Sequence, residues 1–144
     1  MKRDVDFVIM EGPLSWSDRY ELAEVMVELD GFMIADLQSY REGLFESMLT
    51  LFEDQTPMRI DAIRAGLGAR DHDHLRHQAH ELAGGASYVG AASFARHARA
   101  IETHAKERDF TGAAPLVDAL EEHAGRTLAA LRVVLAEHKG EPEP

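Results

Sequence analysis

Apolar residues recur at steps of three and four along most of this chain, which is the spacing of amphipathic helices. A first helix is expected from about Ser17 to Leu29, because a serine can cap its free amide groups and Asp30-Gly31 ends the apolar run. A short segment from Phe32 to Tyr40 follows, and then a longer helix from about Arg41 to Leu67. Proline removes a backbone donor, so a kink or a break of the longer helix is expected at Pro57.

The second half of the chain predicts three more helices. Two of them flank Gly90, with core-type positions at Leu75, Ala79, Leu82, Ala86 and Val89 before it and at Phe94, Ala98, Ile101 and Ala105 after it. The last helix is expected to begin at about Thr111, with that threonine as its cap, and to run to about Glu137. The connections are short and no segment alternates apolar with polar residues. The pattern therefore predicts an all-α fold: an antiparallel up-and-down four-helix bundle with an additional N-terminal helix.

The length of 144 residues fits one functional domain. We expect a partly flexible N-terminal segment at residues 1–16, a helical domain at residues 17–138 and a disordered tail at residues 139–144. No apolar run is long enough to span a membrane, and acidic residues interrupt the N-terminus, which does not resemble a signal peptide.

Composition excludes several classes of function. The formal net charge of -11 argues against binding to nucleic acid or to anionic membranes, which normally requires clustered lysine and arginine. The chain has no cysteine, so disulfides, cysteine-based zinc sites and thiol nucleophiles are absent from its chemistry. This composition fits a cytoplasmic protein.

Four of the eight histidines lie between residues 71 and 80. If Leu82 faces the core, His80 lies about 200° away around the helix and faces water. His77 and Gly84 flank it on the same stripe, and Arg76 is four residues earlier, close enough for its guanidinium to approach an anion held at His80.

The residues after His80 are small: Gly84, Gly85, Ala86 and Ser87. Glycine inside a helix costs about 1 kcal/mol relative to alanine, so something should compensate for it. One compensation is the close approach of another protein to the exposed imidazole. The alternative is an ordinary solvated histidine followed by glycines that end the helix.

The stretch Ala79-His80-Glu81-Leu82-Ala83-Gly84-Gly85-Ala86-Ser87-Tyr88-Val89-Gly90-Ala91 resembles the signature of the histidine phosphotransfer (HPt) family, His-x-Leu-Lys-Gly followed by small residues and a Gly-Ala turn. The resemblance extends over residues 32–137. It includes the positions Leu51-Phe52, Phe94, Ile101-Glu102 and Arg108-Asp109. One position departs from the pattern, because Ala83 stands where the family usually has a lysine, for which Arg76 is the nearest substitute.

The resemblance implies a function: a phosphocarrier without ATP-dependent kinase activity of its own, relaying a phosphoryl group between receiver-domain aspartates in a two-component phosphorelay. His80 would accept and donate the group at Nε2, supported by Arg76 and Gly84, and His77 with Ser87 would belong to the docking face. The implied partners are response regulator receiver domains and a sensor (hybrid) histidine kinase. No cofactor would be bound by this chain, since Mg²⁺ belongs to the receiver domain in this family.

Two alternatives stay open. Ala83 permits a pseudo-HPt scaffold that binds such partners without carrying phosphate. The three-residue spacing of His74, His77 and His80, with Asp71 and Asp73 nearby, permits a metal-binding helical module, although no second ligand pair accompanies it. The other histidines, His97, His104, His123 and His138, are interpreted as solvated residues on helix surfaces.

Overall fold

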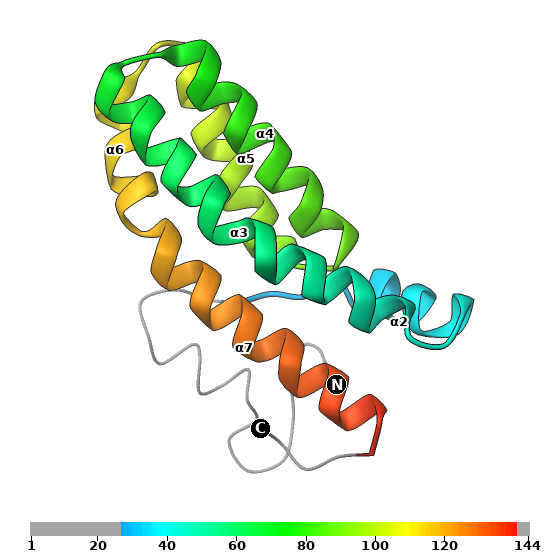
Figure 1. Cartoon of the computed structure of the whole chain (residues 1–144). Coiled ribbons are helices and arrows are strands. Elements are labelled where there is room, and N and C mark those ends of the chain that lie inside the picture. Colours follow the sequence, from blue (N-terminus) through cyan, green and yellow to red (C-terminus); the bar gives the residue numbers. More distant parts are fainter. Residues whose placement is uncertain (1–26, 141–144) are drawn as a thin grey trace.

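The structure is a computed structural model that describes residues 27–140, and all regular secondary structure in this part of the chain is helical (Figure 1). The elements are α2 (Gly31–Tyr40), α3 (Leu44–Ala69), α4 (His72–Tyr88), α5 (Ala92–Lys106), α6 (Phe110–Asp118) and α7 (Leu120–His138). The predicted helix from Ser17 to Leu29 falls mostly outside the described residues. Its last three residues, 27–29, are not helical.

Helices α3, α4 and α5 lie side by side, and α6 followed by α7 completes the bundle (Figure 1). The short helix α2 lies at the end of the bundle where α4 turns into α5. The all-α bundle predicted from the sequence is thus confirmed. None of the described helices is long and apolar enough to cross a membrane.

The core forms where the apolar pattern places it. Each core-type position predicted around Gly90 is at most 2% exposed: Leu75, Ala79, Leu82, Ala86, Val89, Phe94, Ala98, Ile101 and Ala105. The ring of Phe94 also meets that of Phe52 from α3 edge to face, with centroids 6.0 Å apart. This packing holds α4 rigidly between its neighbours, with one face left to solvent.

A kink or a break was expected at Pro57, and the break does not occur: α3 continues through the proline as one helix of 26 residues. The ring of Pro57 is on the exposed side. On the buried side, the Thr56 hydroxyl donates to the Phe52 carbonyl at 2.6 Å, which satisfies a polar group inside the core. Packing of the apolar face before and after the proline outweighs the lost hydrogen bond.

The last predicted helix is wrong in two details. Its cap is Asp109 rather than Thr111, since the Asp109 carboxylate accepts from the Gly112 amide at 2.9 Å. It is also two helices, α6 and α7, separated at Ala119. Just before this junction the Leu116 carbonyl accepts from Nε2 of His97 at 2.6 Å, and a side chain bonded to a helix carbonyl is a known cause of such interruptions.

Candidate functional site: an exposed histidine on α4

Helix α4 presents His80 to solvent. The Asp71 carboxylate caps the helix by accepting from the His74 amide at 3.1 Å, and one face of α4 is buried in the core. His80 lies on another face, and its side chain is 64% exposed. The imidazole is therefore fixed to a rigid helix while remaining open to a partner.

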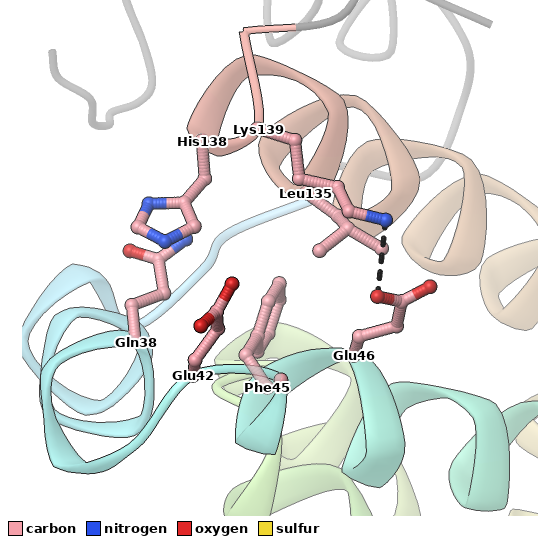
Figure 2. Close-up of a pocket in the computed structure, with 8 residues that line it drawn as sticks. Gln38, Glu42, Phe45, Glu46, Leu135, His138 and Lys139 are labelled. Carbon is pink, nitrogen blue, oxygen red and sulfur yellow. Dashed lines mark ion pairs between the residues drawn. The ribbon is translucent and has the colours of Figure 1, made fainter.

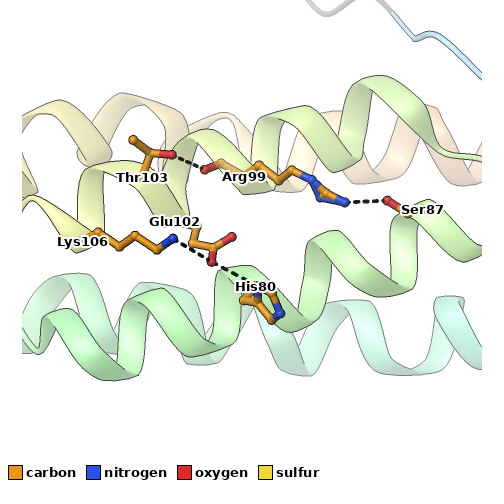
Figure 3. Close-up of polar contacts among 6 residues, drawn as sticks. All are labelled: His80, Ser87, Arg99, Glu102, Thr103 and Lys106. Carbon is orange, nitrogen blue, oxygen red and sulfur yellow. Dashed lines mark hydrogen bonds and ion pairs between the residues drawn. The ribbon is translucent and has the colours of Figure 1, made fainter.

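Glu102 of α5 orients the imidazole. Nδ1 of His80 lies 3.1 Å from Oε2 of Glu102, whose own side chain is only 13% exposed (Figure 3). A carboxylate can only accept, so Nδ1 carries the proton in this pair. In the neutral ring this leaves the lone pair on Nε2, the nitrogen that faces away from Glu102.

Two cations of α5 flank the pair. Nζ of Lys106 lies 3.7 Å from the same oxygen of Glu102, and the Arg99 guanidinium donates to the Ser87 hydroxyl at 3.0 Å (Figure 3). Positive charge is thus available on both sides of Glu102, where α5 lies alongside α4 (Figure 3).

The residues predicted from the sequence to surround His80 fall into two groups. Some lie on the exposed face of α4 that carries His80, here called the open face, and the others lie at its edge. His77 is exposed, and a Cβ added at Gly84 would meet no atom within 4 Å. Ser87 is half-buried and engaged by Arg99, so it belongs to the edge. Arg76 is half-buried one turn before His80.

Two further features of this surface were not foreseen. Tyr88 lies two turns after His80 on the same side of α4 and is 62% exposed, which adds an aromatic ring to the open face. Ala83 is only 1% exposed and belongs to the core cluster. The position at which the family usually has lysine is therefore filled here by a small packed residue.

The remaining histidines were interpreted as solvated, which is wrong for the buried His123 and holds only in part for His97 and His104. His123 is 6% exposed, and His97 is half-buried against it. His104 is half-buried and pairs through Nδ1 with the Asp109 carboxylate at 3.0 Å, whereas His138 is exposed. The apolar pattern places His123 next to Ala124 in the sequence, but it does not show that Phe94 and His97 of α5 pack against the imidazole.

Metal binding finds no geometric support in the described residues. No group of three or more histidine or acidic side chains between residues 27 and 140 could hold a metal ion. Along α4, Nε2 of His72 lies 3.5 Å from Oδ1 of Asp73. The imidazole of His80 is paired with the carboxylate of Glu102 on α5.

A pocket of about 320 Å³ lies away from His80, between the α2–α3 connection and the end of α7 (Figure 2). Its walls carry Gln38, Glu42, Phe45, Glu46, Leu135, His138 and Lys139, with Lys139 paired to Glu46 at 3.0 Å. None of these residues belongs to the surface around His80. The imidazole itself is presented on an exposed face of α4.

Comparison with known proteins finds one family model that matches, the Hpt domain, over residues 47–132. Among solved structures, the chain is similar to histidine-containing phosphotransfer protein B (HptB) from Pseudomonas aeruginosa PAO1, with 28% sequence identity and a TM-score of 0.65. The similarity covers 78% of this chain and 94% of that one. No curated protein matches the sequence significantly.

Proposed function

The chain belongs to the Hpt domain family, whose members are phosphocarriers of two-component phosphorelays, and on this premise we propose that His80 carries the phosphoryl group. The observation that supports this role best is the pairing of an exposed imidazole with a largely buried carboxylate, His80 with Glu102 at 3.1 Å. It leaves the accessible nitrogen with a free electron pair.

The proposed step is transfer from an aspartyl phosphate of a receiver domain. The Nε2 lone pair attacks phosphorus, the N–P bond forms, and the bond from phosphorus to the aspartate oxygen breaks, with the electron pair leaving on the carboxylate. The ring gains positive charge, which the Glu102 carboxylate offsets through the proton on Nδ1. The reverse sequence passes the group on to another aspartate.

The chain itself contributes position and charge rather than a cofactor. We assign the charge that offsets the phosphoryl oxygens to Lys106 and Arg99 on α5 and to Arg76 on α4, since Ala83 stands where the family usually has a lysine. Mg²⁺ would be brought by the receiver domain. The expected partners are response regulator receiver domains and a sensor (hybrid) histidine kinase.

The docking face would comprise His77, Gly84 and Tyr88 around the imidazole, with Ser87 at its edge. The exposed Tyr88 ring supplies apolar contact area, and Gly84 leaves room above the helix one turn from His80. Such a combination suits a protein partner that must bring an aspartyl phosphate within bonding distance of Nε2.

Incubation with a receiver domain carrying a ³²P-labelled aspartyl phosphate tests the proposal. Wild type should acquire acid-labile, base-stable label, His80→Gln should acquire none, and His74→Gln, at an exposed histidine of α4 outside the docking face, should be labelled like wild type. Label that persists in His80→Gln would place the acceptor elsewhere. A wild type that binds receivers without acquiring label from a panel of them would identify a scaffold without phosphotransfer.

The role of Glu102 has a separate readout. Glu102→Gln removes the charge that favours the proton on Nδ1, so ¹⁵N chemical shifts of His80 should show a mixture of tautomers in place of one, and transfer should slow by about tenfold. Glu121→Gln on α7 is the matched control. Identical His80 spectra in Glu102→Gln and wild type would refute the orienting role.

A further inference from the structure

Arg99 on α5 is a cation that is held by a neutral partner. Its guanidinium donates to the Ser87 hydroxyl of α4 at 3.0 Å, and its side chain extends toward that serine (Figure 3). Arg99 is exposed, and it forms no ion pair with any carboxylate of residues 27–140. The other arginine of α5, Arg96, is by contrast paired with the Glu28 carboxylate. The charge of Arg99 is therefore not neutralised within the part of the chain that the structure describes.

A phosphoryl group on His80 would be a stronger partner for this guanidinium than the serine. Its oxygens carry negative charge and can accept two parallel hydrogen bonds from one guanidinium, whereas a hydroxyl is neutral. The Glu102 carboxylate beside the site is already engaged, because Oε2 lies 3.1 Å from Nδ1 of His80 and 3.7 Å from Nζ of Lys106. A new anion at Nε2 of His80 would thus attract Arg99 away from Ser87.

The register of the two helices places Arg99 at the level of Ala83. His80 faces Glu102 across the antiparallel pair, and Ser87 faces Arg99. Arg99 comes three residues before Glu102, so its level on α4 is three residues after His80 and four before Ser87. With a rise of about 1.5 Å per residue, that level is about 4.5 Å from His80 and about 6 Å from Ser87 along the helix axis. Arg99 therefore lies between the two, at the position where the family usually has a lysine.

The backbone of Arg99 is fixed, while its side chain can turn. The Arg99 carbonyl accepts from the Thr103 hydroxyl at 3.1 Å within α5, and the preceding residue, Ala98, is fully buried. Side-chain rotamers of exposed residues interchange within picoseconds to nanoseconds. A change of partner therefore needs no change in the packing of α5 against α4.

We propose that Arg99 changes partner when His80 is phosphorylated: Ser87 holds its guanidinium in the unphosphorylated protein, and the phosphoryl oxygens hold it in the phosphorylated protein. This inference rests on the proposed function, since it requires a phosphoryl group on His80. Arg99 then offsets the charge of the phosphoryl oxygens from the level of Ala83. The Ser87 hydroxyl, at the edge of the docking face, is released at the same time, so the two forms of the protein differ at that edge.

The serine and the phosphoryl group compete for one guanidinium, which gives substitutions of Arg99 and Ser87 opposite effects. Arg99→Gln removes the charge and should slow transfer from a receiver domain to His80 by about fivefold at low salt. Ser87→Ala removes the competing acceptor and should speed transfer by about twofold. The double variant Ser87→Ala/Arg99→Gln should transfer like Arg99→Gln alone, because without the guanidinium the serine has nothing to release.

Transfer rates from one ³²P-labelled receiver domain to the full-length variants test this competition. Arg96→Gln, the other arginine of α5, is the matched control and should transfer at the wild-type rate. A Ser87→Ala variant that transfers at the wild-type rate or more slowly would overturn the proposal. So would an Arg99→Gln variant that transfers like wild type.

NMR spectra observe the change of partner directly and separate it from the proposed function. The ¹⁵N-labelled chain is phosphorylated with a catalytic amount of receiver domain and an excess of acetyl phosphate. Phosphorylation should shift the Ser87 amide signal in wild type and leave it in place in Arg99→Gln. Equal Ser87 signals before and after phosphorylation, or equal shifts in both proteins, would overturn the change of partner alone. A chain that acquires no phosphate on His80 would overturn the proposed function and this inference with it.

Discussion

Replacing Gly84 by glutamine should separate stability from docking, because the structure provides a matched control. A Cβ at Gly84 or at Gly125 would meet no atom within 4 Å, and both glycines lie inside helices, α4 and α7 respectively. Each substitution should therefore stabilise the fold by about 0.5–1 kcal/mol through helix propensity alone. For a domain of this size that corresponds to an increase in Tm of about 2–5 °C.

The two variants should differ in phosphotransfer. Gly84 lies one turn from His80, about 6 Å along the helix axis, so a glutamine there would stand in the path of a receiver approaching Nε2. Loss of about 1.4 kcal/mol of docking free energy would reduce the apparent affinity tenfold. Gly125→Gln, on a helix that contributes nothing to the His80 face, should transfer at the wild-type rate.

Stopped-flow or quench measurements of transfer from one labelled receiver, alongside thermal unfolding, decide the case. A Gly84→Gln variant that is stabilised and transfers normally would refute the idea that this glycine keeps an approach path open. Loss of stability in Gly84→Gln but not in Gly125→Gln would mean that the space above Gly84 is not free.

Three further outcomes are expected. Gly90→Ala should lower the free energy of unfolding by about 2–3 kcal/mol in urea titrations, because the residue has φ +80° and its Cβ would lie 2.6 Å from Cγ1 of Ile34. Phe94→Ala should cost about 3–5 kcal/mol in the same assay, since the ring is fully buried. Lys106→Ala and Arg76→Ala should each slow transfer several-fold at low salt and less at high salt, a loss of about 0.5–1 kcal/mol for a charge that solvent screens, and a salt-independent loss would contradict a purely electrostatic role.

The sequence predicts most of α4 and α5 because a single cause, the burial of one apolar stripe, determines both helices and their exposed faces. Leu82 in the core is enough to place His80 in solvent. Prediction from the apolar stripe fails where a contact distant in sequence also affects the helix. The interruption at Ala119 coincides with a carbonyl bonded by His97, a contact between residues 19 positions apart that no local pattern contains.

Pro57 illustrates the opposite error. A local rule predicted a kink or a break, yet tertiary packing of Phe52 and Ile60 on either side of the proline keeps α3 continuous. A proline inside a helix costs about 3 kcal/mol, whereas each buried large side chain contributes about 1.5–3 kcal/mol, and α3 buries several of them. A single unfavourable residue on the exposed face cannot outweigh that.

Glu102 could have been found from the sequence by register. Antiparallel helices joined at Gly90-Ala91 bring residues at similar distances from the turn to the same level, and His80 and Glu102 are each 11 positions from Ala91. The turn residues and the histidine thus determine which residue of α5 can reach the ring. The register of the two helices does not show that the Glu102 side chain is only slightly exposed. This low exposure strengthens the hydrogen bond from Nδ1 of His80 to the Glu102 carboxylate.

Ala83 shows how the same hairpin affects the electrostatics of the site. Its side chain is packed in the core, and α4 and α5 are bridged on either side of it by His80–Glu102 and by Arg99–Ser87. A lysine at this position would have to leave the core and pass between these two bridges to reach the phosphoryl group. Charge supplied from α5 needs no such path, since Lys106 already extends along the surface to Glu102. The absence of the family lysine is therefore compatible with phosphotransfer, provided that the cations of α5 act in its place.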